Sequence, residues 1–230
     1  MSNYVFIFAR GGSKELKNKN MRLFNGKPLI YHSIQIAKKN KKIKKIFVSS
    51  DSSQILKFAK KLGAETILRP KSLARDNSSE IDAWKHAIKY LKNKNEKFDN
   101  FVSLPCTSPL RIDKDINTAI KKITNKNDFV LGITKSNKSP DFNIIKKTGN
   151  KIRLLKKKKS FLINRQTSQK IFYLTTIVYA CRPEFILSIK RSYWEGNIKF
   201  IEIPKIRSID IDDQNDFSLA EFVHKKNLSI

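Results

Sequence analysis

The stretch Tyr4-Val5-Phe6-Ile7-Phe8-Ala9-Arg10-Gly11-Gly12-Ser13-Lys14 decides the fold, because an apolar strand ends in it at a polar turn that contains glycine. The apolar run is continuous rather than alternating, which is typical of a strand that is covered on both faces. Such strands belong mostly to parallel sheets, whose ligands bind in the loops after the strands. The turn at residues 10–14 is therefore the first candidate for a site.

Strand-like and helix-like segments alternate along the rest of the chain. Apolar runs predict further strands at 46–49, 101–104, 129–133, 171–180 and 198–203. Helical spacing of apolar residues predicts helices at 29–37, 55–62, 81–91, 116–123 and 217–224, with Ser52 or Ser53 and Asp213 as N-caps. The alternation predicts an α/β fold with a mostly parallel sheet and helices on both faces.

One segment, Ser139 to Lys170, interrupts this alternation. Its periodicity is weak, Gly149-Asn150 suits a hairpin turn, and the run 156–159 consists of four lysines. We interpret residues 139–170 as an arm that leaves the main body. Because no repeat or long linker is visible, residues 1–230 are read as a single domain.

Composition limits the environment and the partners of the protein. The chain has 48 Lys and Arg against 20 Asp and Glu, a formal charge of +28. Nucleic acid, an acidic membrane surface and a phosphorylated small molecule all satisfy that sign. The two cysteines, Cys106 and Cys181, can build neither a disulfide framework nor a four-thiolate zinc site, which favours a reducing cytoplasm. No run approaches the ~20 apolar residues of a membrane span.

The first loop combines glycine with positive charge. Gly11 and Gly12 stand beside Arg10, and Lys19 and Asn20 follow shortly after. Glycines allow backbone N–H groups to approach phosphate oxygens, and the cations can neutralise a polyphosphate. The spacing matches neither the P-loop nor the dinucleotide motif. A flexible basic turn remains the alternative interpretation of this loop by itself.

A second group of candidates lies near the other end of the chain. In Ser208-Ile209-Asp210-Ile211-Asp212-Asp213, alternation along a strand would place Asp210 and Asp212 on one side. Mg²⁺ is usually held by one or two carboxylates together with substrate phosphates, and this pair could supply them. Helix capping and surface pairing with lysine are the structural alternative.

The order of short motifs resembles one family, the acylneuraminate cytidylyltransferases. The matching stretches run through nearly the whole chain: Phe8 to Lys14, Lys19-Asn20, Asn25 to Leu29, Val48 to Asp51, Leu68-Arg69-Pro70, Leu73-Ala74 with Asp76, Thr107 to Arg111, Arg165-Gln166 and Ile209 to Asp212. Each motif is weak alone, and it is the ordered set that is specific to the family.

The resemblance implies a Rossmann-like nucleotide-diphospho-sugar transferase fold and a homodimer in which the arm reaches toward the partner's site. It implies Mg²⁺ bound by Asp210 and Asp212, and an active-site arginine, Arg165, near an acidic sugar. Arg10 and Lys19 would join Arg165 in catalysis. The nucleotide-binding residues that it implies are Arg10, Gly11, Gly12, Lys19, Asn20, Arg69 and Ser78.

Three positions depart from the family pattern. Pro105 stands where the family usually has glutamine, Glu80 where some members have serine, and Thr175-Thr176 where many have Asn-Gly. These positions face the nucleotide or the sugar in the family, so the identity of the sugar stays open.

The expected reaction is the activation of a 2-keto-3-deoxy sugar acid, such as N-acetylneuraminate or a related nonulosonic acid, with CTP to give a CMP-sugar and pyrophosphate. A nucleotidyltransferase for an octulosonate derivative is the nearer alternative. A basic nucleic-acid-binding protein is the more distant one, because the lysines are spread along the chain and most phenylalanines lie in core-like patterns. We expect no nucleic-acid or membrane partner.

Overall fold

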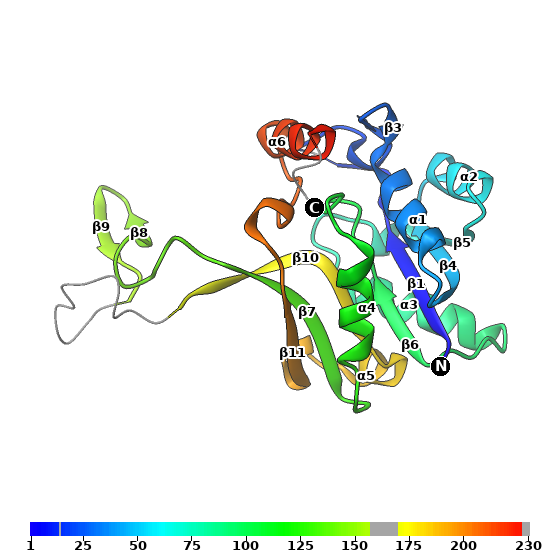
Figure 1. Cartoon of the computed structure of the whole chain (residues 1–230). Coiled ribbons are helices and arrows are strands. Elements are labelled where there is room, and N and C mark those ends of the chain that lie inside the picture. The colour runs from blue at the N-terminus through cyan, green and yellow to red at the C-terminus, as the bar shows by residue number, and fades with distance from the viewer. Residues whose placement is uncertain (14, 157–169, 227–230) are drawn as a thin grey trace.

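The computed structural model describes residues 1–13, 15–156 and 170–226. In these residues seven strands form one sheet in the order β11-β7-β10-β6-β1-β4-β5 (Figure 1). All neighbours are parallel except β10, which runs antiparallel to β6 and β7. The strands are β1 (Asn3–Phe8), β4 (Ile43–Ser50), β5 (Glu65–Leu68), β6 (Asn100–Ser103), β7 (Asp128–Lys135), β10 (Phe172–Cys181) and β11 (Asn197–Glu202). The mostly parallel α/β fold is confirmed.

Helices cover both faces of this sheet. They are α1 (Leu29–Lys39), α2 (Ser53–Lys61), α3 (Glu80–Asn93), α4 (Asp113–Lys121), α5 (Pro183–Ser188) and α6 (Gln214–Lys225), with short 3₁₀ turns η1 (Lys19–Met21), η2 (Lys71–Leu73), η4 (Tyr193–Glu195) and η5 (Lys205–Arg207). The predicted caps are confirmed at Ser52, which accepts from the N–H of Ile55, and at Asp213, which accepts from that of Asp216. Helix α5 was not predicted, because its six residues are too few to show a period.

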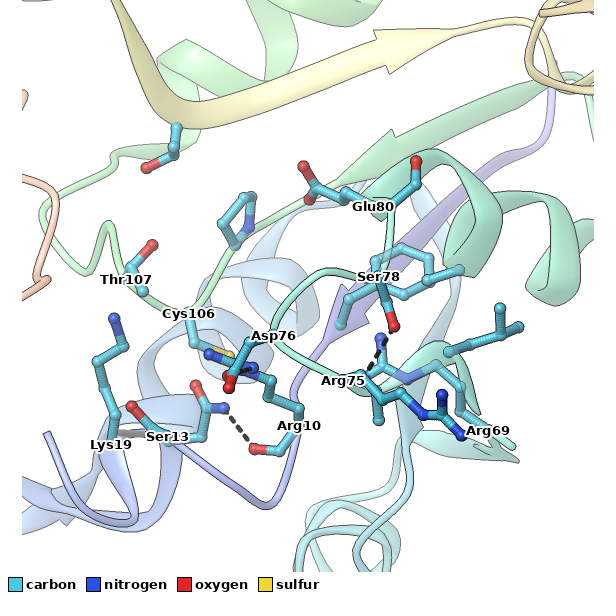
Figure 2. Close-up of a pocket in the computed structure, with 18 residues that line it drawn as sticks. Arg10, Ser13, Lys19, Arg69, Arg75, Asp76, Ser78, Glu80, Cys106 and Thr107 are labelled. Carbon is cyan, nitrogen blue, oxygen red and sulfur yellow. Dashed lines mark hydrogen bonds and ion pairs between the residues drawn. The ribbon is translucent and has the colours of Figure 1, made fainter. Parts of the chain in front are cut away.

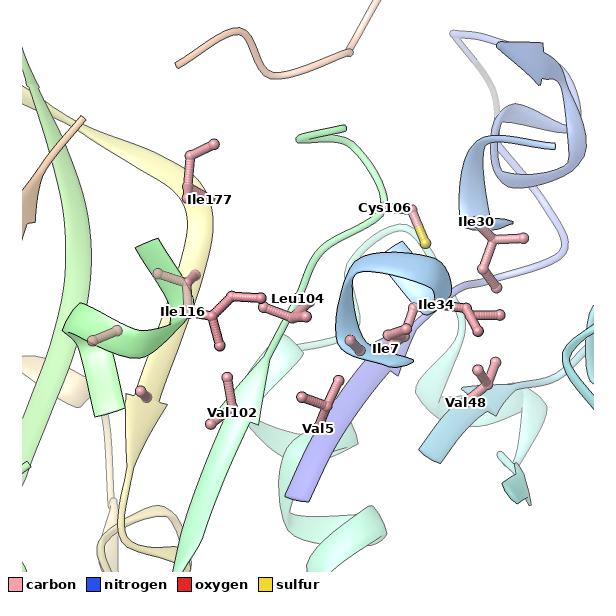
Figure 3. Packing of buried hydrophobic residues seen from close by; sticks show 14 of the residues in the cluster. Val5, Ile7, Ile30, Ile34, Val48, Val102, Leu104, Cys106, Ile116 and Ile177 are labelled. Carbon is pink, nitrogen blue, oxygen red and sulfur yellow. The ribbon is translucent and has the colours of Figure 1, made fainter. Parts of the chain in front are cut away.

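The two faces of β1 bury different kinds of side chain, because successive residues of a strand point in opposite directions. Val5 and Ile7 face α1, α2 and α4 in an aliphatic cluster (Figure 3). Tyr4 and Phe6 face α3 and α5 in a cluster rich in aromatic rings, with Trp84 of α3 within it. The continuous apolar run of the first strand thus reflects burial on both faces.

The topology places a ligand site beside β1. The chain passes from β1 through β4 to β5 on one side and then returns through α3 to β6 on the other side of β1. Adjacent loops diverge where the order of strands reverses, which opens a crevice at the carboxyl ends of the strands. The loops after β1 and β6 border that crevice.

Strands β7 and β10 continue beyond the body of the sheet, and the hairpin of β8 (Ile145–Thr148) and β9 (Lys151–Leu154) lies at their far end (Figure 1). Gly149, in the predicted turn, has a φ of 59°. The described part of residues 139–170 projects from the main body (Figure 1). Residues 157–169 lie outside the described ranges, and the dimerisation role stays a prediction.

Helix α6 packs at the carboxyl edge of the sheet against the short hairpin of β2 (Leu23–Phe24) and β3 (Lys27–Pro28). The segment before α6 differs from the prediction, because residues 208–212 have no regular secondary structure instead of forming a strand. Within this coil only Ile211 is fully buried. No helix in the described ranges is both long and apolar enough to cross a membrane.

Candidate active site

A pocket of about 330 Å³ opens at the carboxyl ends of β1, β5 and β6 (Figure 2). Its wall comes from the loops after these strands, from the start of α3 and from β10. The lining residues include five of the predicted site residues, Arg10, Lys19, Asn20, Arg69 and Ser78, and two of the departures from the family pattern, Glu80 and Pro105. The third departure contributes Thr176.

The loop after β1 supplies the cationic end of the pocket. Arg10 forms an ion pair with Asp76, which belongs to the segment between η2 and α3. The side-chain amide of Asn20 donates to the carbonyl oxygen of Arg10 at 3.0 Å and holds the loop in its bend. A bound polyphosphate would compete with Asp76 for the Arg10 guanidinium, because both offer anionic oxygen.

Gly11 and Gly12 do not line this pocket. The N–H of Gly11 already donates to a carboxylate oxygen of Asp51 at 2.9 Å. A Cβ at Gly11 would lie 2.9 Å from that of Ser52, so the glycine allows this loop to approach α2 closely. The structure thus gives Gly11 a packing role, and Gly12 has open space around it. The phosphate contact of these two glycines stays a prediction.

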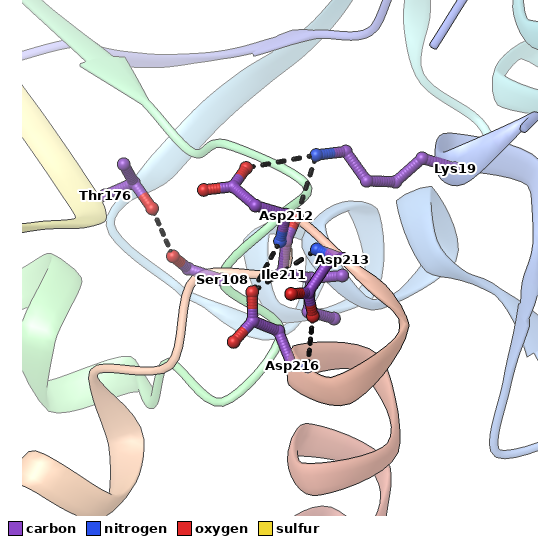
Figure 4. A network of polar contacts seen from close by, with 7 residues as sticks. All are labelled: Lys19, Ser108, Thr176, Ile211, Asp212, Asp213 and Asp216. Atoms are coloured by element: carbon purple, nitrogen blue, oxygen red, sulfur yellow. Dashed lines mark hydrogen bonds and ion pairs between the residues drawn. The ribbon is translucent and has the colours of Figure 1, made fainter. Parts of the chain in front are cut away.

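The two ends of the chain meet beside the pocket. The ammonium group of Lys19 donates to the carbonyl oxygen of Ile211 at 2.7 Å and lies 3.3 Å from a carboxylate oxygen of Asp212 (Figure 4). The N–H of Ile211 donates to the carbonyl oxygen of Thr107, at 2.8 Å, in the loop after β6. The glycine-containing loop and the paired aspartates therefore converge beside the pocket.

Asp210 has the features of a cation ligand. Its Oδ1 is buried and accepts no hydrogen bond from the described residues. Burial raises the pKa of this carboxyl, and the charge of Asp212 adds to the rise, although hydrogen bonding from Thr107 opposes it. An unpartnered carboxylate oxygen beside a second carboxylate suits a divalent cation. No group of three or more metal-ligating side chains occurs in the described ranges, so substrate oxygens would have to complete the shell.

The end of the pocket away from Lys19 and Ser13 carries Arg69 and Glu80 (Figure 2). Arg69 is 6% exposed, and its Nε has no hydrogen-bond partner in the described residues. Burial lowers the pKa of its guanidinium, while Asp51 partly offsets this effect. Ser78 closes a turn, donating to the carbonyl oxygen of Ser72 and accepting from the N–H of Arg75, both at 3.0 Å.

The side chain of Arg111 holds the loop after β6 in place through hydrogen bonds. It is 4% exposed and donates to the carbonyl oxygens of Ile177, at 2.8 Å, and Pro105, and to the hydroxyl oxygen of Ser33 at 2.7 Å. The sequence motif contained this arginine, but only its burial identifies it as a structural residue. Arg165 lies outside the described residues.

Cys106 lines the pocket, and its side chain is buried. Burial raises the pKa of Cys106 to about 12, so this side chain is no nucleophile at neutral pH. His32, His86 and His224 all lie within helices. His32 and His224 pack edge to face, with their ring centroids 5.2 Å apart.

The chain is similar to a known protein family and to several curated proteins. The family model described as Cytidylyltransferase matches residues 4–223. "Post-translational flagellin modification protein B" of Campylobacter coli is 32% identical and covers 96% of this chain and 95% of its own length. "CMP-N,N'-diacetyllegionaminic acid synthase" of Campylobacter jejuni is 30% identical over 97% of this chain and 95% of its own.

A further curated relative and a solved structure also match this chain. "N-acylneuraminate cytidylyltransferase" of Escherichia coli is 30% identical over 96% of this chain, which spans about half, 52%, of that relative. A solved CMP:2-keto-3-deoxy-manno-octonic acid synthetase complexed with CTP superimposes with a TM-score of 0.73 at 13% identity, covering 99% of this chain and all of that one, which supports the fold alone. The resemblance noted from the sequence is confirmed: the chain belongs to the cytidylyltransferase family and is a nucleotidyltransferase.

Proposed function

We propose that this enzyme transfers the cytidylyl group of CTP to the anomeric hydroxyl of a nonulosonic acid, giving a CMP-sugar and pyrophosphate. The observation that carries the proposal is the convergence of the Arg10–Lys19 loop with Asp210 and Asp212 beside one pocket. The names of the 30% identical relatives, which refer to N-acylneuraminate and N,N'-diacetyllegionaminic acid, support the class of acceptor.

The residues of the pocket suit this chemistry by position and charge. The acceptor hydroxyl oxygen forms a bond to the α-phosphorus and gives up its proton, while the bond from that phosphorus to the bridging oxygen of pyrophosphate breaks. Arg10 and Lys19 would neutralise the phosphate oxygens, including the charge that develops on the leaving pyrophosphate. Little covalent chemistry is required of the protein, which fits a pocket with no activated nucleophile among its described residues.

We further propose Asp210 and Asp212 as ligands of Mg²⁺. Bound there together with phosphate oxygens, the ion would neutralise charge across the triphosphate. The buried Oδ1 of Asp210 without a partner supports this assignment, because a cation would satisfy it. The ion pair between Lys19 and Asp212 would loosen when both groups turn to the ligand.

A homodimer is part of the same proposal. The projecting hairpin exposes Ile145, Ile152 and Leu154, with exposed fractions of 53%, 67% and 39%. Apolar side chains on a projecting hairpin favour contact with another surface. We propose that the arm contacts a second copy of the chain and that Arg165 meets the acidic sugar there.

Pyrophosphate release tests the proposed function. CTP, UTP, GTP and ATP are each supplied with N-acetylneuraminate, N,N'-diacetyllegionaminate or 3-deoxy-octulosonate in the presence of MgCl₂. We expect release with CTP and one of the two nonulosonic acids. Preference for another nucleotide, or for octulosonate, would refute the proposal as stated.

A variant pair tests the metal assignment. Asp210→Asn is expected to increase the Mg²⁺ concentration for half-maximal rate by at least about tenfold, since it removes the charged ligand. Asp113→Asn makes the same change at an exposed residue that starts α4 and does not line the pocket. Equal Mg²⁺ dependence in the two variants would remove Asp210 from the metal site.

A further inference from the structure

A buried ion pair outside the pocket joins α4 to η5. It consists of Asp115 and Arg207, whose side chains are only 6% and 7% exposed. The guanidinium of Arg207 donates to both carboxylate oxygens of Asp115, and the bond from Nη2 to Oδ1 measures 3.1 Å. Neither residue lines the pocket, and nothing in the mechanism above uses them.

The pair connects two segments that border the candidate metal site. Asp115 lies in the first turn of α4 and also accepts from the N–H of Ile112 at 2.9 Å, so it is fixed to the end of the loop after β6. Arg207 ends η5, and Asp210 follows it closely in the sequence. The ion pair therefore ties the start of the loop before α6 (residues 208–212) to the loop after β6.

Asp210 lies between two fixed points of the loop before α6. Arg207 is the first, and Ile211, whose N–H donates to the carbonyl oxygen of Thr107 at 2.8 Å, is the second. Residues 208–212 have no regular secondary structure, so no ladder of backbone hydrogen bonds holds this segment in place. The position of the Asp210 carboxylate therefore depends on the contacts at the two ends of the loop.

The buried ion pair contributes orientation more than stability. Burial removes both charges from water, and this loss of hydration offsets much of their attraction. Apolar side chains of similar volume would hold α4 and η5 together about as well. Only the ion pair fixes a direction, because two parallel N–H···O bonds align the guanidinium with the carboxylate. Such alignment matters next to a cation site, where the ligand oxygens must be placed accurately.

We propose that Arg207, through its ion pair with Asp115, is the positioning residue for Asp210. The pair holds the loop before α6 so that the buried Oδ1 of Asp210, which has no hydrogen-bond partner in the described residues, is available to Mg²⁺. This inference rests on the proposed function, because it takes Asp210 as a ligand of Mg²⁺. A change at Arg207 should weaken the metal site although this side chain does not line the pocket.

The Mg²⁺ dependence of pyrophosphate release tests the inference. Arg207→Lys keeps the charge but cannot form the two parallel bonds, so the Mg²⁺ concentration for half-maximal rate should rise about tenfold, the lower end of the effect of outer-shell partners. Saturating Mg²⁺ should restore most of the wild-type rate. Arg207→Met/Asp115→Asn removes both charges and keeps an acceptor for the N–H of Ile112. This double variant should have a urea midpoint near that of wild type and yet show the same rise.

Two measurements without turnover give independent readouts. Calorimetric titration with CTP, in EDTA and in MgCl₂, gives the factor by which the metal strengthens nucleotide binding. This factor should fall about tenfold in Arg207→Lys and in the double variant, with CTP binding in EDTA unchanged. Hydrogen exchange of the ligand-free protein should become faster in peptides that contain residues 208–213, whereas peptides from α1 should exchange as in wild type.

A second buried ion pair provides the matched control. Lys199 lies 2.8 Å from a carboxylate oxygen of the buried Asp128, which begins β7 at the amino edge of the sheet, away from the pocket. Lys199→Met and Arg207→Met each leave a buried aspartate without its cation, so both should lower the urea midpoint. Only Arg207→Met should change the Mg²⁺ dependence. If Arg207→Met does not fold, Arg207→Lys and the double variant still decide the question.

Three results would overturn the inference: unchanged Mg²⁺ dependence in Arg207→Lys and the double variant, an equal rise in Lys199→Met, or a rise with unchanged hydrogen exchange at residues 208–213. The second result would reduce Arg207 to a contribution to stability. Each leaves the proposed cytidylyl transfer standing. If Mg²⁺ affects neither the rate nor CTP binding of wild type, the metal assignment fails and this inference with it. If wild type releases no pyrophosphate from CTP with any sugar acid, the proposed function itself fails.

Discussion

Replacing Lys19 by methionine tests whether the two ends of the chain are joined through this side chain. The ammonium group of Lys19 is the donor in a 2.7 Å hydrogen bond to the carbonyl oxygen of Ile211, and the side chain is 15% exposed. Methionine keeps most of the length and the apolar stem but removes the donor and the charge. The loop before α6 then loses its direct link to the loop after β1.

The magnitude follows from the two partners of Lys19. A hydrogen bond from a charged donor contributes about 1.5–3 kcal/mol, so Lys19→Met should lower the free energy of unfolding by about 2 kcal/mol. The ion pair with Asp212 spans 3.3 Å, but the carboxylate side chain is 66% exposed. Its coupling energy with Lys19 should therefore stay below about 1 kcal/mol.

Urea unfolding at neutral pH, followed by tryptophan fluorescence, measures both quantities. Wild type, Lys19→Met, Asp212→Asn and the double variant form a thermodynamic cycle, and equal m-values would show that the transitions are comparable. A cost below about 0.5 kcal/mol for Lys19→Met, with its hydrogen bond to Ile211 removed, would refute the reasoning. So would a coupling above about 2 kcal/mol, which would make Asp212 the main partner.

Two further predictions concern buried groups that take no part in the proposed chemistry. Burial opposes ionisation of Asp128, but hydrogen bonds from Lys199 and two backbone N–H groups outweigh it and lower the pKa of this carboxyl. The stabilising contribution of the ionised Asp128 carboxylate is complete above about pH 4 and is lost as pH falls through the lower pKa of the folded state. Urea unfolding should therefore show that Asp128→Asn is less stable than wild type by about 2 kcal/mol at pH 7 and by a smaller amount at pH 3. The same difference in stability at both pH values would contradict this prediction. Burial raises the pKa of Cys106 to about 12, so its thiol should react with iodoacetamide at pH 7.5 about 1000-fold more slowly in the folded protein than in the unfolded chain. Mass spectrometry measures both alkylation rates. Similar rates in the folded and unfolded protein would show that the thiol is accessible.

Local pattern was sufficient for most of the scaffold. The helix at Ser53–Lys61 has its cap, its apolar period and its glycine stop within residues 52–63, so the prediction needed no distant contact. The strand at Asn3–Phe8 is equally local, because burial on both faces leaves a continuous apolar run. Helices and strands that depend on short-range periodicity can therefore be predicted from the sequence.

The errors arise where a segment is held by distant partners. Residues 208–212 alternate like a strand, yet no neighbouring strand is available, and Ile211 is instead pinned by Thr107 and Lys19. The partner of the Gly11 N–H is equally distant, because it is a carboxylate oxygen of Asp51, 40 residues further along the chain. Such competition between partners is invisible in a local window.

The sequence by itself determined the α/β alternation, the chemistry of the loops after the strands and the family to which the chain belongs. These follow from residue type and order. The tertiary structure decided which of those residues share a pocket, since Lys19 and Ile211 are 192 positions apart.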